Sequence, residues 1–473
     1  MIDVGQELED KQTQQLTELL YEYHDLFAWE KNSIGRTDVI THSIELEDEK
    51  PIKHNPRGLA PAERKYLEEE IKRMLNEGII RESASDWASP IVLVEKKNGE
   101  LRLCVDYRKL NKKTKKDSYP LPRIDDLLDA LAGSQWFTQL DLASGYWQVA
   151  MNPRDIPKTA FTTMHGLYEF MVMPFGLTNA PGTFQRLMDK ILRGMLWQSV
   201  IVYLDDVNVY SKSWEEHLVH LRNVFERIKG AGLKLNPKKC KFGSTKVHFL
   251  GHIVGKDGIQ MDPEKIEKVQ NYPRPINVTQ VRGFLGLAGY YRKFISKFAT
   301  RAAPMTKLLQ KGIPFEWTSN QQEAFEDLKR CLVSAPIRIY PDFSKSFILC
   351  TDASNIALGA ILAQKDKEGN ERVVAYASRT LLKAEKNYAV TELECLAVVW
   401  AIKHFSKYLY GSKFTLYTDH SALADMQNKP DLKGRPARWI MSLQPYSYEV
   451  KHREGNKHKN VDALSRIRSE YWN

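Results

Sequence analysis

Lone acidic residues end several of the apolar, strand-like runs in this sequence. Asp141 follows Gln-Leu, the pair Asp205 and Asp206 interrupts a β-branched run, and Asp352 and Asp419 close the near copies Leu-Cys-Thr-Asp and Leu-Tyr-Thr-Asp. A carboxylate at the end of a buried strand is poorly solvated, and two such carboxylates close together repel each other. A divalent cation relieves both penalties, since Mg²⁺ takes one or two carboxylates together with waters and substrate phosphate oxygens.

The chemistry that such acids could support is phosphoryl transfer. Two cations about 3.5–4 Å apart can hold the entering and leaving oxygens of an in-line displacement. A single acid at a strand end is more often a cap or a turn former. Two separate groups of acids in one chain indicate instead two metal-dependent sites that act on phosphates.

The charge distribution points to a polyanionic partner. The chain has 473 residues, with 69 Lys and Arg against 59 Asp and Glu, which gives a net charge of +10. Residues 1–50 carry a net −9, so the remaining residues carry +19. Contacts to phosphates release counterions and dominate non-specific affinity for nucleic acids. A soluble protein with a high isoelectric point is the plain alternative reading of the charge alone.

The composition excludes several other classes of protein. Hydrophobic residues make up 42% and charged residues 27% of the chain, which is typical of a globular protein. No run approaches the ~18 uncharged apolar residues of a membrane span, and the acidic start lacks the apolar core of a secretory signal. Five scattered cysteines without a Cys-x-x-Cys pair argue against a disulfide framework, so a reducing compartment is expected.

Two hairpins and a succession of helices are predicted around these acids. Asn-Gly between apolar runs is a strong hairpin signal and joins strands at 91–94 and 101–105, while a second hairpin over 199–210 carries two adjacent acids at its turn. Apolar periodicity predicts helices over 14–27, 63–76 and 214–229, and a helical, basic region over 263–331.

The chain changes character from residue 347. Short strands at 347–351, 360–362 and 373–376 precede a helix over 391–407 and a further strand at 414–418. This order of strands, helix and strand is typical of a small α/β domain.

Ordered motifs in the sequence closely resemble those of reverse transcriptases, in particular the gypsy class of LTR-retrotransposon polyproteins. The polymerase part carries Val-Asp-Tyr-Arg-Lys-Leu-Asn at 105–111, Tyr-Pro-Leu-Pro-Arg at 119–123, Leu-Asp-Leu-Ala-Ser-Gly-Tyr-Trp at 140–147, Pro-Phe-Gly-Leu-Thr-Asn-Ala-Pro at 174–181, Tyr-Leu-Asp-Asp at 203–206 and Phe-Leu-Gly-His at 249–252. Thr-Asp-Ala-Ser at 351–354, Thr-Glu-Leu-Glu-Cys-Leu at 391–396, Tyr-Thr-Asp-His at 417–420 and Asn-Val-Asp-Ala-Leu-Ser-Arg at 460–466 resemble the ribonuclease H domain of that class. Protease, zinc-knuckle and integrase motifs are not seen, so we expect a fragment of a longer polyprotein.

This resemblance implies an α+β multidomain fold. A right-hand polymerase with fingers, palm and thumb would be followed by a ribonuclease H-like α/β domain. The expected boundaries are an acidic N-terminal extension at 1–50, fingers and palm at 51–260, a helical thumb and connection at 261–340, the ribonuclease H domain at 341–468 and a tail at 469–473.

The polymerase acids and the triphosphate contacts are also implied by the resemblance. In the family the metals sit on Asp141 and on the pair Asp205 and Asp206, with Asp141 and Asp205 as principal ligands. The residues that match the fingers contacts to the incoming triphosphate are Arg102 and either Lys96 or Lys97, because the hairpin spacing leaves the choice of lysine open.

The resemblance assigns further residues around the nucleotide and the primer. Tyr146 would pack beneath the nucleotide sugar and exclude a 2′-hydroxyl, with a core tyrosine as the alternative. Phe175 stands where retroviral relatives usually have Gln, which implies a steric contact to the dNTP, and Asn208 stands where an apolar strand residue is usual. The hairpin that grips the primer end would consist of Phe249, Leu250, Gly251 and His252.

In the ribonuclease H part, four acids match the metal-binding residues of the family, namely Asp352, Glu394, Asp419 and Asp462. Glu392 competes with Glu394, but Ala397 and Ala401 follow Glu394 at the spacing of the family's helix. His452 matches a loop histidine that helps the product leave, and a solvated histidine is the alternative.

The implied function is that of an RNA- and DNA-directed DNA polymerase joined to a ribonuclease H. We expect two Mg²⁺ ions per active site, with Mn²⁺ able to substitute. The expected partners are an RNA template, a DNA primer–template, an RNA/DNA hybrid and dNTPs, without a membrane, and the choice between monomer and homodimer stays open. The expected location is a cytoplasmic retrotransposon particle. A catalytically inactive nucleic-acid-binding descendant is the alternative, against which the intact acids argue.

Overall fold

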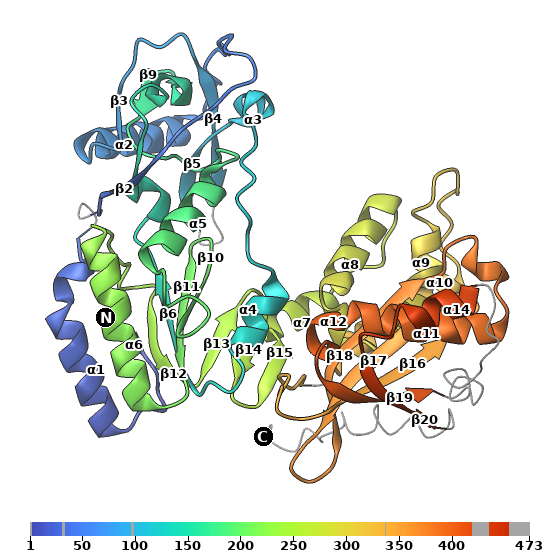
Figure 1. Ribbon diagram of the computed structural model, residues 1–473. Coiled ribbons are helices and arrows are strands. Elements are labelled where there is room, and N and C mark those ends of the chain that lie inside the picture. Colours follow the sequence, from blue (N-terminus) through green and yellow to red (C-terminus); the bar gives the residue numbers. More distant parts are fainter. Residues whose placement is uncertain (1, 31–33, 96–98, 336, 419–434, 454–473) are drawn as a thin grey trace. The chain divides into compact units, whose positions relative to one another are not determined.

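The computed structural model describes the chain except for residues 1, 31–33, 96–98, 336, 419–434 and 454–473. Contacts divide the chain into two compact units, Met1–Val247 and His248–Asn473. Each unit combines helices with sheets (Figure 1). Within the described part, none of the helices has both the length and the apolar content needed to cross a membrane.

A five-stranded sheet in the first unit carries the first group of acids. Its order is β1-β12-β6-β11-β10, in which only β1 and β12 run parallel. The helices α5 and α6 pack on it and bury Leu140, Val207 and Val209 in the main core of the unit. The bounds are β1 (Asp3–Val4), β6 (Trp136–Asp141), β10 (Val200–Tyr203), β11 (Asp206–Ser211), β12 (Lys241–Ser244), α5 (Ala180–Ile191) and α6 (Trp214–Gly230).

The acidic N-terminal segment is part of this unit. Helix α1 (Asp10–Glu22) lies along α6 (Figure 1), and its Leu16 and Leu19 are buried. The indole nitrogen of Trp214 donates a hydrogen bond to Gln15 Oε1 at 2.9 Å. Further along, β2 (Thr37–His42) pairs in parallel with β7 (Val149–Met151). The N-terminal segment is therefore hydrogen-bonded to later parts of the first unit.

A second sheet of the first unit has the order β3-β9-β8-β4-β5. The hairpin predicted around Asn-Gly is confirmed, since β4 and β5 are antiparallel with Ile91 opposite Val105. Helix α2, which covers the predicted 63–76 segment, contacts β3 and β5. The bounds are α2 (Pro61–Asn76), β3 (Ile80–Glu82), β4 (Ser89–Glu95), β5 (Leu101–Val105), α3 (Arg108–Lys113), α4 (Ile124–Ala130), β8 (Phe161–Thr163) and β9 (Gly166–Phe170).

The second unit contains the predicted helical region and the predicted small α/β fold. Its larger sheet has the order β18-β17-β16-β19-β20, with β19 parallel to both of its neighbours, and α11 packs against β16 and β17. The bounds are β13 (Lys246–Phe249), within which the unit boundary falls, β14 (His252–Gly255), β15 (Gly258–Met261), α7 (Pro263–Gln270), α8 (Val278–Tyr290), α9 (Phe298–Lys307), α10 (Ser319–Val333), β16 (Phe347–Ala353), β17 (Ala357–Lys365), β18 (Glu371–Thr380), α11 (Val390–His404), α12 (Ser406–Leu409), β19 (Lys413–Thr418), α14 (Arg435–Met441) and β20 (Ser447–His452).

Two predicted helices have the wrong extent. The helix expected over 14–27 begins earlier, because Glu9 and Gln12 form a reciprocal cap at its start, and it ends at Glu22 before a short 3₁₀ turn. The helix expected over 391–407 stops at His404, because Phe405 leaves the helical conformation before α12 begins. Apolar periodicity continued through both breaks, which is why the sequence did not reveal them.

Candidate active sites

The fold brings the first three acids together. Asp141 is the last residue of β6 and Asp206 the first of β11, and the antiparallel register places them opposite each other. Side chains opposed in this way have Cβ atoms about 4.5–5.5 Å apart. Asp205 lies in the two-residue turn between β10 and β11. Residues far apart in the sequence therefore form one cluster of carboxylates.

Burial and mutual repulsion disfavour the ionised form of these carboxyls. Desolvation, followed by the charges of Asp141 and Asp206, raises the pKa of Asp205 to about 6, although the side chain still reaches solvent. Desolvation also raises the pKa values of Asp141 and Asp206. The Lys239 ammonium, 3.4 Å from Asp141 Oδ2, opposes these shifts. The cluster therefore holds more negative charge than its surroundings neutralise.

The residues present fit a divalent cation that binds together with its substrate. Asp141 Oδ1 is buried and has no hydrogen-bond partner among the described residues, which is costly for a carboxylate oxygen. In the same part of the chain, no group of three His, Cys, Asp or Glu side chains could hold a metal ion unaided. Mg²⁺ does not need such a cage, because it takes one or two carboxylates and completes its shell with waters and phosphates.

Gln185, which the sequence did not single out, supports the acidic turn. This residue of α5 is buried, and its Oε1 accepts a hydrogen bond from the backbone nitrogen of Leu204 at 2.9 Å. Its Nε2 donates to Asp189 Oδ1 at 3.0 Å. Leu204 has a φ of 54°, a left-handed conformation that is uncommon for residues other than glycine. The motif at 174–181 ends before Gln185 and no helix was expected over α5, so the sequence carried no signal for this residue.

The predicted nucleotide contacts line one pocket of about 1230 Å³ in the first unit. Arg102, Tyr146 and Phe175 share it with Asp141 and Asp205. Phe175 stacks on Tyr146 with ring centroids 5.0 Å apart, and the Arg102 guanidinium lies 4.9 Å from the Phe175 centroid. The other predicted contacts, Lys96 and Lys97, lie outside the described residues.

The four residues predicted to grip the primer, 249–252, form a tight turn between β13 and β14. Leu250 and Gly251 have φ values of 48° and 73°. The hydroxyls of Tyr290 and Tyr291 donate to the carbonyl oxygens of Leu250 and Gly251, at 2.6 and 2.7 Å. A Cβ on Gly251 would approach the Tyr291 hydroxyl to 3.0 Å, and with the positive φ a larger residue would strain this turn. The two tyrosines, adjacent in sequence, are positioning residues that the motif alone did not reveal.

The second group of acids lies on the larger sheet of the second unit. Asp352 is near the end of β16, and Glu394 on α11 is only 5% exposed. Glu392 is engaged elsewhere, since its Oε2 accepts a hydrogen bond from the Ala389 backbone nitrogen at 3.2 Å and its Oε1 lies 3.8 Å from Arg435. These contacts favour Glu394 as the glutamate that faces the sheet.

The remaining predicted residues of this site are described only in part. β19 is parallel to β16 and ends at Thr418, whereas Asp419 and Asp462 lie outside the described residues. His452 is exposed on β20, opposite Thr418. The side chain of Lys297, from the helical region, contacts this site: its ammonium lies 2.9 Å from Asp352 Oδ2.

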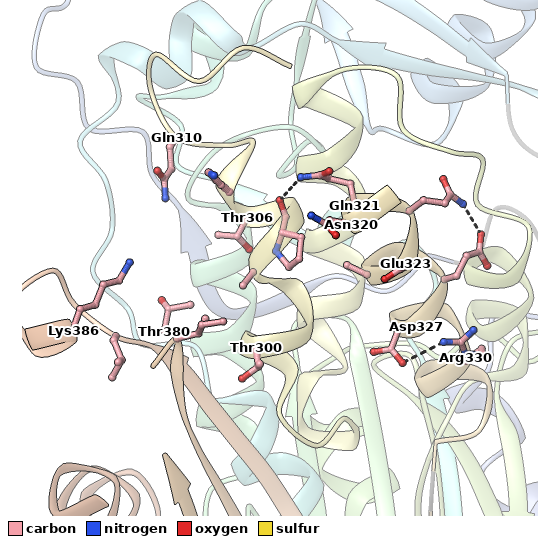
Figure 2. Close-up of a pocket in the computed structure, with 18 residues that line it drawn as sticks. Thr300, Thr306, Gln310, Asn320, Gln321, Glu323, Asp327, Arg330, Thr380 and Lys386 are labelled. Atoms are coloured by element: carbon pink, nitrogen blue, oxygen red, sulfur yellow. Dashed lines mark hydrogen bonds and ion pairs between the residues drawn. The ribbon is translucent and has the colours of Figure 1, made fainter. Parts of the chain in front are cut away.

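A pocket of about 1280 Å³ lies elsewhere in the second unit (Figure 2). Residues of α9 and α10 line it together with Thr380 and Lys386. Its acids include Asp327, which pairs with Arg330 at 3.5 Å and with Arg301 at 2.5 Å. The residues that line this pocket include none of the predicted site residues, so we do not assign it chemistry.

Comparisons with known proteins agree with this arrangement. The family model for reverse transcriptase (RNA-dependent DNA polymerase) matches residues 94–254, and the model for the RNase H-like domain found in reverse transcriptase matches residues 342–446. The Pol polyprotein of transposon 297 from Drosophila melanogaster is 41% identical over 98% of this chain and 44% of its own length. The Tf2-3 polyprotein of Schizosaccharomyces pombe is 39% identical over 90% of this chain and 32% of its own length.

Solved structures share the fold. The foamy viral protease-reverse transcriptase in complex with double-stranded DNA has a TM-score of 0.83 at 23% identity and covers 95% of both chains. The same viral protein in complex with an RNA/DNA hybrid has a TM-score of 0.76 at 22% identity and covers 94% of this chain and 61% of that one.

Fold and family models together define the class as a right-hand polymerase followed by a ribonuclease H-like domain. The chain belongs to the reverse transcriptase–ribonuclease H region of gypsy-like LTR-transposon Pol polyproteins. It spans less than half the length of the polyproteins compared above.

Proposed function

We propose that this chain extends a primer 3′-hydroxyl with dNTPs on RNA and DNA templates and hydrolyses the RNA strand of RNA/DNA hybrids. The observation that carries the proposal is the single pocket that contains Asp141 and Asp205 together with Arg102, Tyr146 and Phe175. Carboxylates for a metal, a guanidinium for phosphates and an aromatic wall for the sugar are the groups that nucleotide transfer needs.

In the polymerase site, Asp141 and Asp205 with support from Asp206 would hold the two Mg²⁺ or Mn²⁺ ions. Bound there, the ions supply charge neutralisation for the attacking hydroxyl and for the α-phosphate. Arg102, held over the Phe175 ring, would donate to the triphosphate, as would Lys96 or Lys97. The ring of Tyr146 would close the space below the sugar and so exclude a 2′-hydroxyl.

In the ribonuclease H site, Asp352, Glu394, Asp419 and Asp462 would hold the second pair of ions. Recognition of the RNA strand would rest on its 2′-hydroxyls and on the shape of the hybrid. His452 would assist departure of the product. The turn at residues 249–252 would position the primer end.

The wider context is also a proposal. The division into fingers and palm (51–260), thumb and connection (261–340) and ribonuclease H (341–468) follows the family. The foamy viral protein that shares the fold was solved with double-stranded DNA and with an RNA/DNA hybrid, which supports nucleic acids as partners. A cytoplasmic retrotransposon particle is the proposed location.

Primer extension and hybrid cleavage, each with Mg²⁺, test the proposal on the same preparation. Asp205→Asn should abolish extension and leave cleavage intact, whereas Asp352→Asn should do the opposite. If folded wild-type chain bound primer–template but gave neither product, the inactive nucleic-acid-binding descendant would be the better reading. If either variant lost both activities while folded, the assignment of two separate sites would be wrong.

A further inference from the structure

A lysine from the helical region contacts the first predicted metal ligand of the ribonuclease H site. Lys297 Nζ lies 2.9 Å from Asp352 Oδ2, and the two side chains are 55% and 41% exposed. Lys297 directly precedes α9 and has a left-handed backbone, with φ 53° and ψ 33°. That conformation is unfavourable for a residue with a Cβ, so the chain carries a lysine where glycine would fit more easily.

The segment that carries Lys297 also contacts strand β18 through residues other than this ion pair. The backbone nitrogen of Ala299 donates to Ser378 Oγ at 2.9 Å. Arg338 donates to the carbonyl oxygen of Val374 at 2.8 Å and lies 5.0 Å from the ring centroid of the buried Phe294. These contacts hold the chain on both sides of Lys297 against β18 and do not involve the ion pair.

The sheet leaves room for the lysine side chain. Gly359 is the strand partner of Asp352 on β17. A Cβ at Gly359 would lie 3.9 Å from Lys297 Cγ, so the aliphatic part of Lys297 passes this strand on its way to the carboxylate.

We propose that Lys297 competes with the metal ion for Asp352 at the ribonuclease H site. Its ammonium neutralises this carboxylate until a divalent cation displaces it, which raises the concentration of Mg²⁺ that hydrolysis requires. The inference rests on the proposed function. An exposed ion pair adds little to the stability of the fold. The lysine ammonium nevertheless occupies the carboxylate oxygen that a metal ion would bind, and its positive charge repels that ion.

The polymerase site differs in this respect. There the corresponding contact, Lys239 to Asp141, is longer at 3.4 Å, and Asp141 Oδ1 has no hydrogen-bond partner in the described part.

Direct Mn²⁺ binding to the full chain tests this inference. In the Mn²⁺-binding samples, Asp205→Asn is present throughout to weaken the polymerase site, and one sample that also carries Asp352→Asn identifies the signal of the ribonuclease H site. Lys297→Met keeps a Cβ and the aliphatic length but removes the charge, Lys297→Arg restores it, and Lys386→Met removes a charge elsewhere in the second unit. Electron paramagnetic resonance reports free Mn²⁺, and hybrid cleavage and primer extension are followed against Mg²⁺ in chains with an intact Asp205.

We expect Lys297→Met to bind Mn²⁺ about 2–5-fold more tightly at the Asp352 site. The Mg²⁺ midpoint of hybrid cleavage should fall by a similar factor while that of primer extension stays unchanged, and Lys297→Arg and Lys386→Met should behave like the wild type. Unchanged or weaker Mn²⁺ binding in Lys297→Met would overturn the inference, and with a lower unfolding temperature it would make the ion pair a docking contact. Failure of the wild type to cleave hybrids would count against the proposed function instead, because Mn²⁺ binding is measured without substrate.

Discussion

At the scale of single residues, Tyr146 belongs to two environments. Its ring is 8% exposed and packs against Phe184 in the core, yet it also stacks on Phe175 and lines the pocket that contains Asp141. Burial raises the pKa of its hydroxyl, so the phenol stays neutral. A core tyrosine and a barrier below the nucleotide sugar, which were alternatives from the sequence, are compatible in the structure.

Replacing Tyr146 by Val should relax the discrimination against ribonucleotides. A smaller side chain would relieve the clash with a 2′-hydroxyl, and a change of about 10–1000-fold in the ratio of kcat/KM values corresponds to roughly 1.4–4 kcal/mol. Single-nucleotide extension with dCTP and CTP on one template measures this ratio. Tyr146→Phe keeps the ring and should stay near the wild type, and hybrid cleavage by the same preparation checks folding. An unaltered ratio in Tyr146→Val would leave Tyr146 with a core role alone.

Replacing Gln185 by Leu should impair polymerisation without contact to the substrate. The change keeps the side-chain volume but removes the acceptor for the Leu204 backbone nitrogen, so the turn that carries Asp205 loses its support. Small displacements of catalytic groups are costly, and we expect kcat for extension to fall about 10–100-fold with little change in KM for dNTP. Hybrid cleavage should be unaffected. An equal loss of both activities would point to unfolding of the chain.

At the scale of elements, the β10–β11 hairpin combines the acidic turn with a polar residue in its core. Asn208 is fully buried in β11, between Ile201 on β10 and Gln139 on β6. Neither its side-chain nitrogen nor its oxygen has a hydrogen-bond partner among the described residues. The sequence had marked Asn208 as a departure from the family, and its setting is unfavourable for an amide.

Replacing Asn208 by Val should therefore stabilise the first unit. Removal of an unsatisfied buried amide and its replacement by a β-branched side chain should add about 1–2 kcal/mol to the free energy of unfolding. Asn111→Val is the matched control, because Asn111 donates to the Gly176 carbonyl at 2.8 Å and accepts from the Thr178 nitrogen at 2.9 Å, so its loss should destabilise. Denaturant unfolding measures both changes. Destabilisation by Asn208→Val would mean that the amide has a partner, such as a bound water.

At the scale of the whole molecule, the N-terminal segment connects to the polymerase acids through backbone pairs. Phe27 pairs with Leu235, and Leu235 pairs in turn with Leu142, the residue after Asp141. Arg36 donates to the carbonyl oxygen of Trp147 at 2.5 Å. The segment is thus both the acidic part of the chain and a support for the candidate site that contains Asp141.

Deletion of residues 1–50 should abolish primer extension. From charge alone, the loss of a net −9 could tighten non-specific binding if the segment were not structural. Because α1, β1 and β2 are built into the first unit, we expect the truncated chain to lose its near-ultraviolet circular dichroism as well as its activity. A folded, active truncated chain would contradict this role.

The charge of the remaining chain is better tested by salt. Affinity of the full chain for primer–template should fall steeply with KCl, with a slope of about −4 or steeper in a plot of log K against log salt, because each phosphate contact contributes about −0.9. Fluorescence anisotropy measures this slope. A flat plot would contradict binding dominated by phosphates.

The sequence by itself determined the elements and the order of the motifs. The hairpin over 91–105, the helix over 63–76 and the acids at strand ends were readable because hydrogen bonding in turns and apolar periodicity act over a few neighbouring residues. The same motifs, in the same order, predicted the family that the comparisons confirmed.

Only the tertiary structure decided which distant residues support those acids. Gln185 beneath the turn at Leu204, Lys297 against Asp352 and Phe27 beside Leu235 join segments that no local period or spacing relates. Such contacts depend on how sheets and helices pack, because a side chain can meet any partner that the fold brings within hydrogen-bond distance. The acids could therefore be named from the sequence. The residues that support the acidic turn or pair with a carboxylate could be identified only from the folded structure.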